Sequence, residues 1–249
     1  MIRLNDITTK LPVCPGNLLF HCTSSKALFK ILETVTFRGG IIVKQNDLRE
    51  SHLYEQFRFN SVQIYNIIKN YCFSFSFSQN FLGEGSNIPI YGYKKPRMWA
   101  QYADNSQGAC LIFDKAKFSK AIRELSSDYY IFEKSIKYRY SLDDFLAIKD
   151  SENAMDFIIN NQDSLFFIKH SDWRDEDEYK YIAISKNTYF KEVPYVKIRE
   201  CLMGIIMGPR FSSDKQLIDL INKNNLANRV NLYVTIGKYG NITALPYYG

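Results

Sequence analysis

The sequence predicts an α+β fold, because segments with a strand pattern outnumber segments with helical spacing and the two kinds do not alternate regularly. The clearest strand is 72–78 (CFSFSFS), where aromatic or thiol side chains alternate strictly with serines. The clearest helix start is Ser24, which precedes apolar residues at helical spacing. A chain of 249 residues with 46% hydrophobic residues can bury a large core. We therefore expect a single domain over 1–249, with two closely associated subdomains as the alternative.

The individual elements follow from apolar periodicity and from the turn residues between periodic segments. The apolar run 18–24 predicts a buried strand, and Gly39 and Gly40 end the helix that Ser24 begins. Glycines and prolines within 80–96 predict a loop long enough to act as a lid or binding loop. The other expected elements are a strand over 39–45, one or two helices within 47–70, a helix from Pro96, a strand over 108–114, a helix over 115–125, a strand pair over 129–140, one or two helices over 143–168, strands over 177–185, 200–208 and 231–237, and a helix from Ser212 or Ser213 to Asn224.

Composition and charge narrow the class of protein. The chain carries 32 Lys and Arg against 26 Asp and Glu, and this net charge of +6 favours anionic partners without the lysine density of a dedicated nucleic-acid coat. The first residues lack the apolar run of a signal peptide, and no apolar run approaches the ~20 residues that span a bilayer. We therefore expect a cytoplasmic protein without membrane association. The five scattered cysteines are expected to be reduced core thiols.

Several common chemistries lack their sequence signals. The chain has three histidines and no Cys-x-x-Cys or His-Glu-x-x-His spacing, so no metal site is expected. It has no G-x-S-x-G motif, and the adjacent His21 and Cys22 would point to opposite faces of a strand. The glycines around Glu84 lack the pattern of a phosphate-binding loop.

Two groups of polar residues are candidates for a site. His21 lies at the end of an apolar strand and is followed by Thr23, so the two residues present several hydrogen-bonding groups at one edge. The alternative is that His21 is a core histidine bonded to backbone. Glu176 and Glu178 share one face if the strand over 177–185 begins early. Like charges on one face repel, which favours a functional reason for the pair, and the alternative is an acidic turn exposed to water.

Serines and aromatic residues give two further candidates. Ser74, Ser76 and Ser78 form the serine face of the strand 72–78, where hydroxyls can bind ribose or amide groups; the alternative is an ordinary edge-strand surface. Trp99 and Tyr102 lie one helical turn apart and could clamp an aromatic ring, with core packing as the alternative.

Taken in order, seven motifs resemble a bacterial family labelled a domain of unknown function, over residues 18–209. They are LFHCTS, QNDLRE, CFS, MWAQYA, GACLIFD, KHSDWRDEDEYK and GIIMGP. The family's usual arginine after the paired glutamates is Lys180 here, which keeps the charge but not the forked donor geometry. This pattern is in turn similar to the ADP-ribosyltransferase superfamily, in which a first-strand histidine or arginine, a middle-strand serine or tyrosine and a late-strand glutamate converge around NAD.

The resemblance implies a split β-sheet core with flanking helices and NAD as the substrate. It implies that His21 and Thr23 contact the nicotinamide ribose and carboxamide, that CFSFS with Ser74 and Ser76 corresponds to the superfamily's serine strand, and that Glu176-Asp-Glu178 corresponds to its E-x-E motif. Glu178 would then stabilise the oxocarbenium-like transition state and Glu176 would orient the nucleophile. Trp99 or Tyr102 would hold the nicotinamide ring, and no metal is required.

The expected function is transfer of ADP-ribose from NAD to a macromolecule, with RNA or DNA favoured over protein by the positive charge. Such an enzyme would act as a bacterial toxin or antiphage effector, with a cognate antitoxin as a further partner. Two alternatives remain open at this stage. One is an NAD glycohydrolase that uses water in the same site, and the other is a non-catalytic nucleotide- or RNA-binding module.

Overall fold

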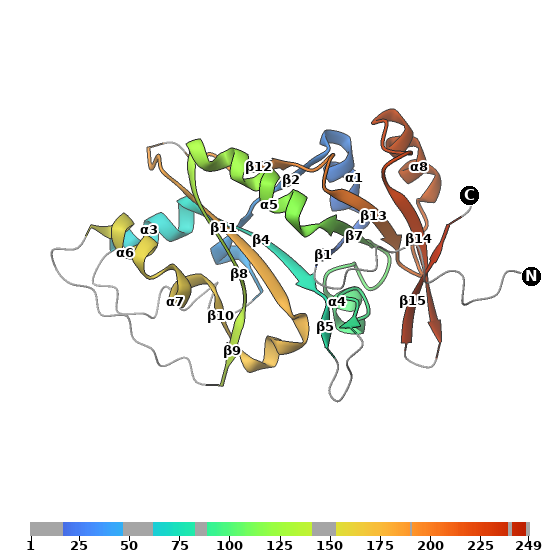
Figure 1. The fold of residues 1–249 in the computed structure, drawn as a ribbon, viewed down its shortest axis with the longest axis horizontal. Helices are drawn as coiled ribbons and strands as arrows, with labels where there is room; N and C mark the ends of the chain where they lie inside the picture. The colour runs from blue at the N-terminus through green and yellow to red at the C-terminus, as the bar shows by residue number, and fades with distance from the viewer. Residues whose placement is uncertain are drawn as a thin grey trace, which may run out of the picture. The chain divides into compact units, whose positions relative to one another are not determined.

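The computed structural model describes residues 17–46, 62–82, 89–140, 153–189, 191–238 and 241–247. The chain divides into two compact units, each assembled from separate stretches of sequence. Unit 1 contains Met1–Phe37, Phe77–Ala121 and Lys197–Gly249, and unit 2 contains Arg38–Ser76 and Ile122–Val196. Both units mix helices and strands, which confirms the predicted α+β class (Figure 1).

Unit 1 is built on a mainly antiparallel sheet with the strand order β15-β14-β13-β7-β1-β4. Strand β1 pairs with β7 along its whole length, from Leu18 opposite Asp114 to Thr23 opposite Ala109. Strands β13 and β14 run parallel and are linked through helix α8 (Asp214–Lys223), as a parallel pair requires a crossover. Figure 1 shows β13, β14 and β15 side by side with α8. The strand bounds are β1 (Leu18–Thr23), β4 (Cys72–Gln79), β7 (Ala109–Asp114), β13 (Leu202–Met207), β14 (Asn231–Lys238) and β15 (Asn241–Pro246).

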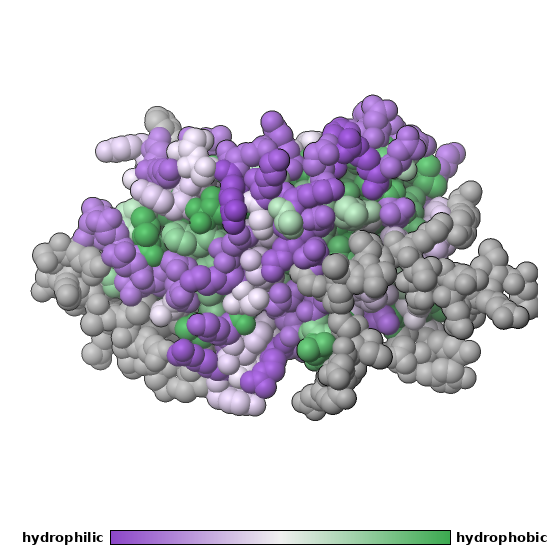
Figure 2. All heavy atoms as spheres, in the orientation of Figure 1, coloured by the Kyte–Doolittle hydropathy of each residue, from purple (hydrophilic) through white to green (hydrophobic). Residues whose placement is uncertain are grey.

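The helices of unit 1 begin and bury their faces as the sequence predicts. Helix α1 (Ser25–Thr34) starts at Ser24, whose hydroxyl accepts a hydrogen bond from the N–H of Ala27, and it buries Leu28 and Leu32 one turn apart. Helix α8 likewise buries Leu217 and Ile221, and Figure 2 shows mostly hydrophilic residues over its outer side. Helix α4 (Pro96–Gln101) carries its proline in the first turn, and α5 (Lys115–Arg123) follows β7 directly.

Two glycines of unit 1 allow backbone segments to approach closely at the end of β1. A Cβ on Gly108 would lie 2.1 Å from the carbonyl oxygen of Thr23, and a Cβ on Gly208 would lie 2.3 Å from the carbonyl oxygen of Ser106. Both contacts are with backbone, which cannot rotate away as a flexible side chain can. Glycine at these positions is therefore a packing requirement.

Unit 2 contains β3, the first part of β4 up to Ser76, β11 and β8 in that order, with three helices packed beside them. Its core consists mainly of isoleucines and phenylalanines from the helices and from β11. Strands β9 and β10 form a separate, parallel two-stranded sheet. The bounds are β3 (Gly40–Ile41), β8 (Tyr129–Ser135), β9 (Lys137–Arg139), β10 (Ile168–His170), β11 (Glu178–Ser185), α3 (Val62–Tyr71), α6 (Ala154–Asn160) and α7 (Gln162–Phe166), with 3-10 helices η2 (Ile42–Lys44), η4 (Glu124–Ser127) and η5 (Ser171–Glu176).

Several boundaries differ from the sequence prediction. The strand expected over 39–45 is limited to β3, which is followed by η2. The helix expected up to Ile168 ends at Phe166, and β10 begins at Ile168. Within 80–96 the described residues include the short hairpin strands β5 (Phe81–Leu82) and β6 (Pro89–Ile90). Strands β2 (Thr36–Arg38), β12 (Tyr195–Lys197) and β15 were not expected. Most of these segments have two to four residues, too few for periodicity to identify them.

No helix among the described residues is long and apolar enough to cross a membrane. The motif QNDLRE lies largely outside the described residues, as do residues 47–61 of the predicted helical region.

Candidate active site

The two candidate glutamates lie in the segment of unit 2 that joins β10 to β11. His170, at the end of β10, caps η5, because its Nδ1 accepts a hydrogen bond from the N–H of Asp172 at 3.3 Å. Helix η5 ends at Asp177, which has left-handed backbone angles (φ 41°, ψ 54°). Strand β11 starts at the next residue, Glu178.

This local structure corrects the prediction for the acidic pair. Glu176 and Glu178 do not share the face of one strand, because Glu176 is the last residue of η5 and Glu178 is the first residue of β11. The alternative of an exposed acidic turn is also wrong, since each glutamate is 3% exposed. The left-handed conformation of Asp177, not the period of a strand, sets their relative positions.

A lysine that the sequence analysis did not single out connects the two carboxylates. Nζ of Lys169, on β10, lies 3.1 Å from Oε2 of Glu176 and 2.7 Å from Oε2 of Glu178. The same ammonium group lies over the ring of Trp173, 5.4 Å from the ring centroid. On β11, Nζ of Lys180 lies 3.4 Å from Oε1 of Glu178.

We call Lys169, Glu176, Glu178 and Lys180 the ion cluster. Its two ammonium groups balance its two carboxylates, and none of the four side chains is more than 7% exposed. An unpaired charge at such a depth costs several kcal/mol, so the ionised carboxylates require the lysines beside them. The repulsion between two adjacent carboxylates is therefore offset by cations.

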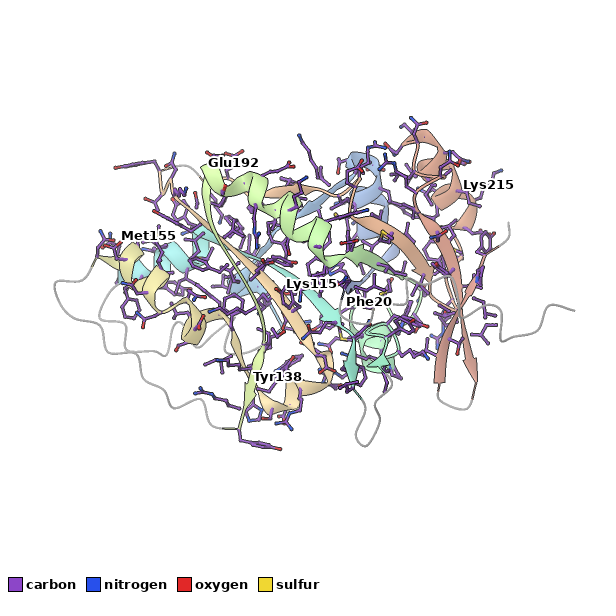
Figure 3. All side chains as sticks on the ribbon, viewed as in Figure 1. Phe20, Lys115, Tyr138, Met155, Glu192 and Lys215 are labelled. Atoms are coloured by element: carbon purple, nitrogen blue, oxygen red, sulfur yellow. The ribbon has the colours of Figure 1, made fainter. Side chains whose placement is uncertain are left out.

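The protonation state of Glu178 results from opposing effects. Burial disfavours the charged form, but Lys180, Lys169 and the hydroxyl of Ser76 outweigh it and lower the pKa of Glu178 to about 2. The backbone N–H of Glu178 donates to the hydroxyl of Tyr138 at 2.9 Å. Figure 3 shows Tyr138 on β9, beside the segment that leads into β11, and burial raises the pKa of its hydroxyl. Glu178 is thus a negative charge at neutral pH, next to a neutral phenol.

The candidate serines of β4 have different partners. Ser76 is close enough to Glu178 to help lower the pKa of its carboxyl, whereas the hydroxyl of Ser74 accepts a hydrogen bond from Nε2 of Gln45 at 2.8 Å. In unit 2 this part of β4 lies between β3 and β11, and Ser74 is buried. The alternative of an exposed edge-strand surface is therefore wrong, and Ser76 is the serine that joins the ion cluster.

His21 and Thr23 belong to unit 1, at the end of β1. The imidazole of His21 is half-buried and stands edge-on to Phe37 and Phe77, with ring centroids 4.7 and 5.9 Å away. Thr23 is buried, and its carbonyl oxygen faces Gly108. The ring contacts leave both interpretations of His21 open, the ligand-binding histidine and the core histidine bonded to backbone.

The aromatic pair of α4 separates into a buried and an accessible residue. Trp99 is 2% exposed in the core of unit 1, and its Nε1 donates to the carbonyl oxygen of Tyr93 at 2.7 Å. Tyr102, at the C-cap of α4, is partly exposed. Core packing therefore describes Trp99, and Tyr102 is partly buried and packs against the same core.

Contacts within unit 2 join Ser76, Glu178 and Glu176, while His21, Thr23, Trp99 and Tyr102 belong to unit 1. Sequence reasoning missed Lys169 and Tyr138. Lys169 could have been identified from the sequence as a candidate, because two buried carboxylates need a cation beside them and the KHSDWRDEDEYK motif begins with a lysine. Across the described ranges, no group of three or more His, Cys, Asp and Glu side chains is arranged to hold a metal ion.

Comparison with known proteins gives one match. Residues 98–181 match a family model described as "Protein of unknown function (DUF2971)". No significant match was found among curated proteins or among solved structures. The matched stretch extends from α4 into β11 and contains the complete ion cluster. Over these residues, the chain is similar to an uncharacterised domain family.

Proposed function

We propose that the chain is an NAD-dependent ADP-ribosyltransferase and that the ion cluster is its acidic centre. The observation that carries this proposal is the setting of Glu178, an ionised carboxylate at the start of a strand with the hydroxyl of Ser76 and the carboxylate of Glu176 nearby. The superfamily that the motifs resemble combines a middle-strand serine with a late-strand glutamate around NAD. The contact between Ser76 and Glu178 is what that resemblance would require.

The reaction assigns a separate task to each glutamate. When the bond between ribose C1′ and nicotinamide breaks, nicotinamide leaves with the bonding electrons and positive charge develops on the sugar. A fixed carboxylate that accepts a hydrogen bond from a ribose hydroxyl stabilises this transition state, and we assign that task to Glu178. Glu176 accepts the proton of the acceptor nucleophile as its new bond to C1′ forms.

The lysines affect how Glu178 can act. Their ion pairs hold the carboxylate in place, so it need not reorient when charge develops on the sugar. A carboxylate has about four acceptor positions, so a ribose hydroxyl can share Glu178 with Lys169 and Lys180. The two lysines also offset part of the negative potential of Glu178. Its proposed stabilisation of the transition state therefore depends on the fixed position of the carboxylate as much as on its charge.

The remaining assignments rest on the resemblance and on charge. His21 and Thr23 are proposed to contact the nicotinamide ribose and carboxamide, and Tyr102 the nicotinamide ring. The net charge of +6 supports RNA or DNA as the acceptor. We propose a role as a bacterial toxin or antiphage effector, with a cognate antitoxin as a partner.

Labelled NAD, incubated with the protein alone and with cellular RNA, DNA or protein, tests this proposal. We expect release of nicotinamide and label on nucleic acid that nuclease removes, with Glu178→Gln eliminating both. Glu176→Gln should reduce transfer to the acceptor more than slow hydrolysis of NAD, because it acts on the nucleophile. The matched control is Glu133→Gln, which removes a carboxylate of unit 2 that pairs with the exposed Arg123.

The possible outcomes separate the rival functions. Nicotinamide release without macromolecular label would support the NAD glycohydrolase. Label that resists nuclease but disappears with protease would exclude the nucleic-acid acceptor and leave the transferase. Absence of turnover under all conditions would reject the enzyme and support a non-catalytic binding module, in which the ion cluster is structural.

A further inference from the structure

We propose that Lys169 is a positioning residue that keeps Glu176 and Glu178 adjacent and ionised together. This inference rests on the proposed function, because it concerns the two carboxylates to which that function assigns the chemistry. It gives a role to Lys169, the first residue of the KHSDWRDEDEYK motif, to which the resemblance assigns none.

The distances single out Lys169 as the link between the two acids. Its Nζ reaches an oxygen of each carboxylate, at 3.1 Å for Glu176 and 2.7 Å for Glu178. Lys180 approaches the other oxygen of Glu178 at 3.4 Å. Two carboxylates that meet at one point tend to share a proton, as like charges a few ångströms apart cannot both ionise without compensation. An ammonium group between them removes that tendency.

The surroundings restrict Lys169 to this position. Its side chain is 7% exposed, and its ammonium group lies over the ring of Trp173. Lys169 comes from β10, which pairs in parallel with β9, so a different strand from that of Glu178 supplies the link. A further titratable group at the cluster is Tyr138, whose hydroxyl is neutral at neutral pH and whose pKa burial raises further above its ordinary value.

Removing the ammonium group should therefore change protonation as well as stability. In Lys169→Met, the carboxyl of Glu178 should titrate about 1–3 pH units higher than in the wild type, because an opposite charge at this distance lowers a carboxyl pKa by that amount. The acidic limb of kcat for NAD cleavage should move upward by a similar interval, with a smaller change in KM. Lys169→Arg keeps the charge and should restore most of the wild-type profile. Lys137→Met, at an exposed position on β9, removes the same charge outside the cluster and should leave the profile unchanged.

Two measurements on these variants decide the matter. Carboxyl titration by ¹³C NMR reports Glu176 and Glu178 directly, and the pH profile of nicotinamide release reports the reaction. If both carboxyls titrate in Lys169→Met as in the wild type, the inference is wrong, whatever happens to activity. If Lys169→Met does not fold, Lys169→Arg is tested instead. Arginine keeps the charge, so its pH profile should resemble that of the wild type. A displacement of that profile as large as the loss of a charge would cause also overturns the inference. If the wild type does not cleave NAD, the proposed function fails, and the NMR titration alone still tests the link between the carboxylates.

Discussion

Replacing Glu178 by glutamine should destabilise the protein in addition to removing the proposed activity. Glutamine keeps the shape of the side chain but removes one of the two negative charges of the ion cluster. Of the ion pairs given above, Lys169 then keeps the one with Glu176 and Lys180 loses the one with Glu178, at positions no more than 7% exposed. Within the ion cluster, the variant therefore has one more cation than carboxylate.

The magnitude follows from the depth of the cluster. Removing one partner of a buried ion pair costs about 3–5 kcal/mol, because the remaining charge stays desolvated. For a chain of this size, a loss of 1 kcal/mol lowers Tm by about 2–4 °C, so the expected fall is about 6–20 °C. The control Glu133→Gln breaks an ion pair with Arg123, whose side chain is 67% exposed, and such surface pairs contribute less than about 1 kcal/mol.

Thermal and urea unfolding at pH 7, followed by circular dichroism, measures both changes. The combined variant Glu178→Gln with Lys180→Met restores the balance of charge and should recover most of the lost stability without recovering NAD cleavage. Equal, small losses in Glu178→Gln and Glu133→Gln would refute the description of a buried, charge-balanced cluster. A combined variant less stable than Glu178→Gln alone would show that charge imbalance is not the cause.

Three further predictions concern pH, backbone packing and the imidazole of unit 1. Folding lowers the pKa of Glu178 from 4.5 to about 2, so its stabilising contribution is present above about pH 4.5 and is lost as the pH falls toward 2. Urea unfolding between pH 5 and 2 should show this loss in the wild type and not in Glu178→Gln. Gly108→Ala should lower the free energy of unfolding by about 2–4 kcal/mol, because the new Cβ would lie 2.1 Å from a backbone oxygen. Gly237→Ala, whose Cβ would have no atom within 4 Å, should change it little. Equal effects of the two substitutions in urea titrations would contradict the close approach at Gly108. His21→Ala should weaken NAD binding by about 1–3 kcal/mol in calorimetry, and an unchanged affinity with a lower Tm would assign His21 to the core.

Local patterns were sufficient to predict the elements on which the site is built. Alternation identified β4, an apolar run identified β1, and Ser24 before helically spaced leucines identified the start of α1. These features depend on neighbours within one or two turns of chain. They placed Ser76 and Glu178 on strands before any tertiary contact was known.

The arrangement of the charges was not predictable in the same way. Strand periodicity suggested a shared face for Glu176 and Glu178, but the left-handed residue Asp177 ends η5 between them and the pair meets through Lys169 instead. Lys169 lies on β10, a strand of three residues that follows two phenylalanines and has no periodic signal of its own. Its role depends on a tertiary contact, and one sequence does not contain that information.

The burial of four charges also bears on why the cluster exists. Replacing a buried ion network by apolar residues of similar size is often neutral or stabilising by about 1–4 kcal/mol, whereas removing a single member is costly. Stability alone therefore gives little reason to bury Lys169, Lys180 and two glutamates in unit 2, where phenylalanines and isoleucines form a core without charge. A reaction that develops positive charge does give such a reason, because it needs a carboxylate that is ionised and fixed before the substrate arrives. If apolar replacement of all four residues raises Tm and abolishes NAD cleavage, the cluster is retained for chemistry; if it raises Tm and leaves cleavage intact, the acidic centre must be sought elsewhere in the chain.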